Sequence, residues 1–205
     1  MLDKLVVLRE RTVYHVAGTR PAAYYIADRE AGGVLVNAPT YDEALLAALR
    51  AAALPAYLFF PSRRGVRDLE RWRASAGMES IAFAAEAPHV EGTVDLAVGR
   101  GRKLSRTIDF LPMSGVTEGS CALRIKNDGG VIFFGPILEP GAGGWPELVP
   151  HDDDYSAENR LIGALALRDQ RFEYAFTDVF EPGRTRFGPG AGSVLRQSLR
   201  RLLES

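Results

Sequence analysis

The chemically most versatile stretch of the sequence is the basic loop Ser62-Arg-Arg-Gly-Val-Arg67, which follows the apolar run at 57–60. Guanidinium groups bind carboxylates and phosphates through forked hydrogen bonds, and free amides at the start of a following helix would add to them. The sequence therefore predicts a candidate anion-binding site at Ser62, Arg63, Arg64 and Arg67. The structural alternative is that these arginines form ion pairs with acids of the fold, namely Asp68, Glu70 or Asp178.

Three further residues could support a different, hydrolytic chemistry. Cys121 would need an activating base or a positive field to act as a nucleophile, and a buried structural cysteine is the alternative. His151 precedes three aspartates, 152–154, and carboxylates can hold hard cations, but three adjacent side chains cannot all point inward. Cys121, His151 and Asp178 are the candidates for a noncanonical enzyme site.

Composition limits the classes of protein to which the chain can belong. Its 205 residues are 46% hydrophobic and 25% charged, with a net charge of -1, which is typical of a globular domain without a general attraction to nucleic acid or membranes. A single cysteine excludes an internal disulfide and a site with several thiolate ligands. The basic stripe Arg196, Arg200 and Arg201 lacks the aromatic residues of a nucleic-acid surface. We expect one cytoplasmic domain over residues 1–205, with no membrane segment.

The elements that position these residues alternate between strands and helices. Hydrophobic periodicity predicts helices after a cap at Thr40, from about residue 66 to 76, and over 159–170 and 192–203. The expected strands are 5–8, 12–16, 24–27, 34–36, 57–60, 81–85, 93–98, 107–111, 121–125, 131–134 and 172–179. A β-rich first half with helices, followed by a comparable second half, predicts two stacked sheets with helices outside.

Four landmarks in this order resemble the metallo-β-lactamase fold family over about residues 12 to 203. The paired strands Tyr24-Tyr-Ile-Ala-Asp and Gly33-Val-Leu-Val-Asn-Ala-Pro39 resemble its N-terminal strands, and Ser62-Arg-Arg-Gly-Val-Arg67 stands in the place of its His-x-His-x-Asp-His motif. Pro112-Met-Ser-Gly-Val-Thr-Glu-Gly-Ser120 is similar to its Pro-Gly-His-Thr-x-Gly-Ser turn, and Val131-Ile-Phe-Phe-Gly-Pro-Ile-Leu138 to its Phe-x-Gly-Asp-x-Leu strand. The resemblance implies a four-layer αββα sandwich.

The same resemblance implies that the metal ligands of the family are lost. The histidine positions of the first motif fall on Ser62, Arg64 and Arg67, and its aspartate falls on Val66. The later histidine falls on Val116, the bridging aspartate on Pro136, and near the last histidine only Thr177-Asp-Val-Phe-Glu181 is found. Zinc or iron needs imidazole, thiolate or carboxylate ligands, and guanidinium groups repel a cation. We therefore expect no metal and no other cofactor.

Three functions remain open at this stage. The first is a pseudoenzyme of a metallo-hydrolase family that binds a small anionic ligand or a protein partner near the vestigial cleft. The second is a hydrolase-type enzyme that uses a noncanonical site. The third is a structural or assembly subunit, and a homodimer would be compatible with any of the three.

Overall fold

The computed structural model describes residues 1–204, and the chain divides into two compact units, residues 1–99 and residues 100–205. Each unit has its own sheet and its own pair of α-helices. The expectation of a single domain over the whole chain stays a prediction.

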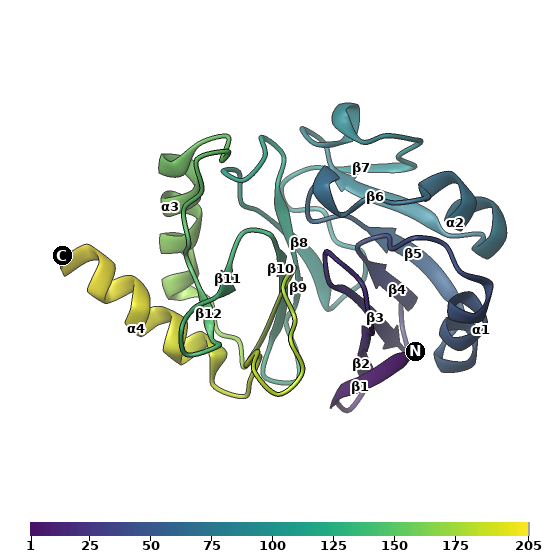
Figure 1. The fold of residues 1–205 in the computed structure, drawn as a ribbon, viewed down its shortest axis with the longest axis horizontal. Helices are drawn as coiled ribbons and strands as arrows, with labels where there is room; N and C mark the ends of the chain where they lie inside the picture. Colours follow the sequence, from purple (N-terminus) through teal and green to yellow (C-terminus); the bar gives the residue numbers. More distant parts are fainter. Residues whose placement is uncertain (205) are drawn as a thin grey trace. The chain divides into compact units, whose positions relative to one another are not determined.

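The first unit is built on a seven-stranded sheet whose strands follow one another in sequence order (Figure 1). The strands are β1 (Leu2–Val7), β2 (Arg11–Val16), β3 (Ala23–Asp28), β4 (Gly32–Val36), β5 (Pro55–Phe59), β6 (Glu79–Phe83) and β7 (Leu96–Val98). β1 to β4 pair antiparallel, whereas β4 to β7 pair parallel. Parallel strands need crossover connections, and the helices of this unit supply two of them.

Helices α1 (Glu43–Ala52) and α2 (Leu69–Ala76) lie on the same side of this sheet (Figure 1). Leu45, Leu46 and Leu49 of α1 and Trp72 of α2 pack in one apolar cluster with side chains of the central strands. The cap of α1 is Asp42, whose Oδ1 accepts the amide hydrogen of Leu45, so the expected cap at Thr40 is wrong by two residues.

The second unit contains a four-stranded sheet in the order β13-β10-β9-β8. Its elements are β8 (Ile108–Pro112), β9 (Cys121–Ile125), β10 (Val131–Gly135), the short hairpin β11 (Glu139–Pro140) and β12 (Pro146–Glu147), α3 (Ala157–Ala166), β13 (Tyr174–Thr177) and α4 (Ala191–Glu204). β13 joins β10 in parallel after the α3 crossover. α3 and α4 bury Ala164, Leu195 and Leu199 in a cluster with the apolar residues of β9 and β10.

Three short 3₁₀ helices complete the chain: η1 (Arg63–Gly65), η2 (Ala87–His89) and η3 (Leu167–Asp169). The α-helix expected from about residue 66 begins only at Leu69, and the helix expected over 159–170 ends as an α-helix at Ala166 and continues as η3. Across residues 1–204, no helix is long and apolar enough to cross a membrane.

Trp72 is the largest fully buried side chain, and it ties α2 to the segment that follows β4. Its Nε1 donates to the carbonyl oxygen of Pro39 at 2.8 Å, and its ring meets that of Tyr41 edge-on at 5.0 Å between centroids. Replacing Trp72 with alanine should therefore lower the free energy of unfolding by about 3–5 kcal/mol in urea titrations. Leu54→Ala, at a side chain that is 76% exposed, is the control. A loss no larger than that of the control would contradict the role given to Trp72.

Candidate functional site

The loop after β5 is held by hydrogen bonds within the loop and by one to Glu86. The amide of Arg63 donates to Glu86 Oε1 at 2.7 Å, and the amide of Arg64 donates to Ser62 Oγ at 3.3 Å. The next two amides, of Gly65 and Val66, donate to the carbonyl oxygens of Ser62 and Arg63. These four amides are thus already used, and the expected anion site at Ser62, Arg63, Arg64 and Arg67 stays a prediction.

Glu86 is the acceptor on which the start of this loop depends. Its side chain has no exposed surface, and Oε2 lies 3.9 Å from Nη1 of Arg63. A buried carboxylate is stable only where donors compensate for its lost hydration. Two of the three acids expected as alternative partners bind other groups, because Asp68 accepts the amide of Tyr41 and Glu70 pairs with Arg73 at 2.7 Å.

The far side of the loop is braced by the segment after β4. The amide of Ala38 donates to the carbonyl oxygen of Gly65, and Asn37 Nδ2 donates to that of Ala22. A Cβ atom on Gly65 would lie 2.0 Å from Asn37 Oδ1, so only glycine fits this approach. Asn37 itself has a positive φ of 64°, which asparagine tolerates better than most residues.

Arg67 is exposed, as are Arg63 and Arg64, and its side chain lies beside open space. Its Nη1 donates to the carbonyl oxygens of Val66 at 2.7 Å and Arg64 at 3.3 Å. Within the described residues, its Nε and Nη2 groups have no hydrogen-bond or ion-pair partner. The side chain lines two hollows of the first unit, one of about 470 Å³ and one of about 690 Å³.

In the second unit, the turn between β8 and β9 is packed against the start of α3. The amide of Ser156 donates to the carbonyl oxygen of Gly115 at 2.9 Å, and that of Tyr155 to Val116. Gly115 has a φ of 149°, and a Cβ atom there would lie 2.5 Å from Cβ of Arg160. Val116, where the resemblance places a histidine, is 3% exposed and belongs to the apolar cluster of this unit.

A buried guanidinium fixes the segment that contains Pro136. Arg160 donates to the carbonyl oxygens of Pro136 and Ile137 at 3.0–3.2 Å, and its Nη1 lies 2.6 Å from Asp154 Oδ2. Both charged side chains are at most 2% exposed. Burial alone would raise the pKa of Asp154, but the His151 amide and the Arg160 guanidinium outweigh it, so this pKa lies below its usual value.

The side chains at the expected ligand positions do not fit a metal ion. Ser62 supplies a buried hydroxyl that already accepts an amide hydrogen, Arg64 and Arg67 bring positive charge, and Val66, Val116 and Pro136 have no side-chain donor atom. In the part of the chain that the structure describes, no three His, Cys, Asp or Glu side chains form a group that could hold a metal ion. No reaction step through a metal therefore follows from these residues.

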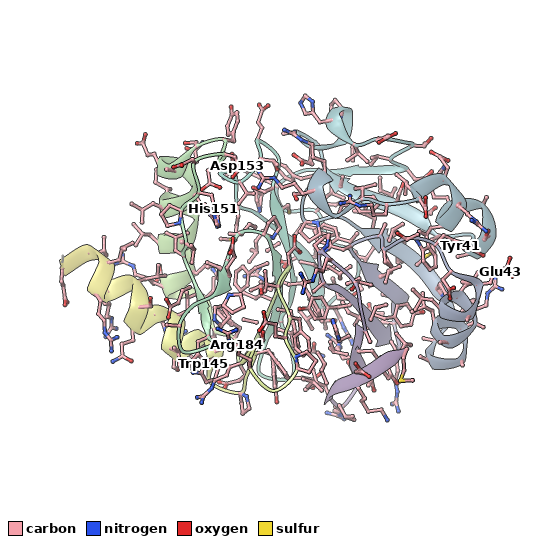
Figure 2. The ribbon with its side chains drawn as sticks, viewed as in Figure 1. Tyr41, Glu43, Trp145, His151, Asp153 and Arg184 are labelled. Carbon is pink, nitrogen blue, oxygen red and sulfur yellow. The ribbon has the colours of Figure 1, made fainter. Side chains whose placement is uncertain are left out.

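The three candidates for a noncanonical enzyme site, Cys121, His151 and Asp178, have surroundings that do not form one active site. Cys121 is fully buried in β9, where burial and then the charge of Asp109 raise the pKa of its thiol far above the usual range. His151 lies on the loop before α3, where Figure 2 labels it together with Asp153. Its Nε2 atom is 2.5 Å from Glu139 Oε1. The amide of Asp178 donates to Gly135. His15 is buried in β2 and His89 is exposed in η2, so the histidines do not converge.

Sequence reasoning missed three charged residues that matter here. Glu86 could have been noticed as a single acid within the apolar run at 81–87, and Arg160 as a charge on the apolar side of α3. Arg20, in the turn before β3, lines the 470 Å³ hollow together with Arg67. Nothing in its local sequence distinguishes it from an ordinary turn residue.

Solved structures of the same fold are similar to this chain over nearly its whole length. A subclass B3 metallo-β-lactamase of Bradyrhizobium japonicum is 13% identical, with a TM-score of 0.67 over 98% of this chain and 92% of that one. A metallo-β-lactamase of Cronobacter sakazakii with a HARLDQ motif is 13% identical, with a TM-score of 0.66 over 94% and 90%. One from Legionella gormanii is 14% identical, with a TM-score of 0.64 over 100% and 96%. No family model and no curated sequence matches the chain.

These similarities show the fold. The chain has the metallo-β-lactamase fold, and the αββα class expected from the order of its landmarks is confirmed. At 12–16% identity the likeness carries no activity over from those enzymes to this protein.

The lowered pKa of Asp154 makes the stability of the protein depend on pH. A carboxylate whose pKa is depressed by folding stabilises the protein above its unfolded pKa of about 4, and this contribution is lost as the pH falls through the folded value. Asp154→Asn should cost about 3 kcal/mol at pH 7 and flatten the decrease in stability below pH 4, as measured by urea unfolding. Asp152→Asn, at an exposed neighbour, is the control. If stability fell below pH 4 as steeply in Asp154→Asn as in the unaltered protein, Asp154 would not be the group responsible.

Proposed function

We propose that this protein is a metal-independent, non-hydrolytic member of the metallo-β-lactamase fold that acts by binding a small anionic ligand through Arg67. The observation that carries the proposal is the replacement of metal-ligand positions by guanidinium groups, of which Arg67 faces open space with unused donors. A guanidinium stays protonated at physiological pH and offers five N–H donors. Positive charge in place of a cation favours an anion at the same loop.

In this proposal the guanidinium groups of the loop do the binding, because the amides of residues 63–66 already donate to Glu86, Ser62 and Arg63. The four candidate residues Ser62, Arg63, Arg64 and Arg67 therefore differ in how well they could bind an anion. Ser62 is buried and caps η1, and the Arg63 guanidinium lies near Glu86, which weakens its attraction for a further anion. Arg67 bonds only to neutral carbonyl oxygens, so its full charge remains available to a ligand.

A hydrolytic alternative has less support from the surroundings of its candidate residues. A nucleophilic cysteine must be a thiolate at neutral pH, whereas burial and the charge of Asp109 favour the neutral thiol of Cys121. Among the solved structures, the Cronobacter sakazakii enzyme is described by a HARLDQ motif. The arginine of that motif falls at the position of Arg64, in a protein named as a metallo-β-lactamase, so Arg64 by itself does not decide between the two functions.

Metal analysis tests the metal-independent part of the proposal. Protein purified from cells grown with added zinc, iron and manganese should contain each metal far below one ion per chain, because the ligand positions carry no suitable donors. Its unfolding temperature should also be unchanged by EDTA. Near-stoichiometric metal that survives mild chelation would overturn the proposal. A Pro136→Asp variant measured in parallel shows whether a single restored carboxylate changes metal retention.

The role of Arg67 is tested by titrating acetate and inorganic phosphate into the protein by calorimetry. Arg67→Gln should weaken the binding of these anions about tenfold or more, since hydrogen bonds to charged groups contribute about 1.5–3 kcal/mol each. Arg9→Gln removes an equal charge at an exposed turn that lines neither hollow and should bind like the unaltered protein. Equal affinities of the Arg67 and Arg9 variants would remove Arg67 from consideration.

A further inference from the structure

The smaller of the two hollows beside Arg67 is formed by segments that are distant in sequence. It lies among the end of β2 and the turn before β3, the segment from Ala38 to the start of α1, and Arg67. Tyr41 and Glu43, labelled in Figure 2, mark the start of α1. All of these residues belong to the first unit.

The lining of this hollow is mixed, and its exposed apolar part comes from Met1, which is 89% exposed, the half-buried Pro21 and the edge of Leu45. Val16 and Ala38 are each 2% exposed and Leu45 is 8% exposed, and Pro39 is also buried. The buried side chains form the floor and present little surface, so a ligand would meet carbon atoms mainly at Met1, Pro21 and Leu45. A bare inorganic anion would gain nothing from these atoms, whereas each methylene buried against them contributes to binding.

The rim of the hollow carries two guanidinium groups. Arg20 is exposed, and in the described chain it has no hydrogen-bond or ion-pair partner. Arg67 bonds only to carbonyl oxygens and keeps Nε and Nη2 unused. The acid in the lining, Asp42, uses its Oδ1 to cap α1. The rim is thus positive on balance and has donors suited to a carboxylate.

The larger hollow beside Arg67 has a different charge pattern. Its lining includes Arg67 and Arg71, but also Asp68, Glu70 and Glu91. Three carboxylates against two guanidinium groups oppose the binding of an anion there. The smaller hollow is therefore the better place for the ligand.

We infer that the hollow of about 470 Å³ binds an amphipathic organic acid, with its carboxylate between Arg20 and Arg67 and its apolar body against Met1, Pro21 and Leu45. The volume is within the range of about 300–1,000 Å³ found for small-molecule sites. The inference rests on the proposed function and adds to it the location and the chemical class of the ligand. A short acyl chain or a single aromatic ring is the body that fits these three side chains.

The test compares anions that share a charge and differ in their apolar bodies. Hexanoate, phenylacetate, acetate and inorganic phosphate are titrated by calorimetry, with hexan-1-ol as the uncharged analogue of hexanoate. Hexanoate should bind at least about tenfold more tightly than acetate, which corresponds to two buried methylenes. Amide shifts in a ¹H–¹⁵N spectrum should then concentrate at Thr19, Arg20 and Thr40.

Variants separate the two guanidinium groups from the general charge of the protein. Arg20→Gln and Arg67→Gln should each weaken hexanoate binding about tenfold, whereas Arg9→Gln should leave it unchanged. Arg67→Lys, which keeps the charge and loses the forked geometry, should have an intermediate affinity. Circular dichroism and the unfolding temperature verify that each variant is folded.

Each other outcome has a definite meaning. Equal affinity for phosphate, acetate and hexanoate, dependent on Arg67 alone, overturns the amphipathic acid and leaves the proposed anion binding intact. Hexan-1-ol binding as tightly as hexanoate, or hexanoate binding that is unchanged in Arg20→Gln, also overturns the inference. Absence of binding for every anion overturns both this inference and the proposed function.

Discussion

The loop on which the proposed activity depends is held by one buried carboxylate. Glu86 has no exposed surface, so its charge has to be compensated by donors within the protein, and the amide of Arg63 is one of them. This bond fixes the first turn of η1, and the Ala38–Gly65 backbone bond fixes its end. Because both ends are held, the chain leaves the loop in one direction and presents Arg67 at the edge of the two hollows.

Much of the fold could be predicted from hydrophobic patterning. The apolar runs at 57–60 and 131–134 became central strands, since such runs are stable only where both faces are buried. Local capping was less predictable. Thr40 and Asp42 are both good caps, and the choice between them depends on which backbone torsions the preceding segment imposes. The delayed start of α2 has the same origin, because Asp68 is held in the left-handed region.

The site was less predictable than the fold because its parts come from separate segments. The sequence identified the basic loop, but it could not show that Glu86, more than twenty residues away, uses one of the loop amides. Nor could it show that the turn containing Arg20 lies beside Arg67, since this follows from the pairing of β2 with β3 and from the path after β4. The local sequence shows which side chains could bind an anion, whereas the topology of the sheet decides which of them lie side by side.

Gly115 shows that a residue can match a catalytic motif for a purely structural reason. It stands in a turn that resembles a metal-ligand turn, yet Arg160 lies so close that no side chain could be added there. Ser120 likewise closes the turn by donating to the carbonyl oxygen of Met113. Residues of this kind serve the architecture of the turn, whatever chemistry the turn performs. Their presence in this chain is therefore evidence for the scaffold, and by itself it is no evidence for a hydrolase activity.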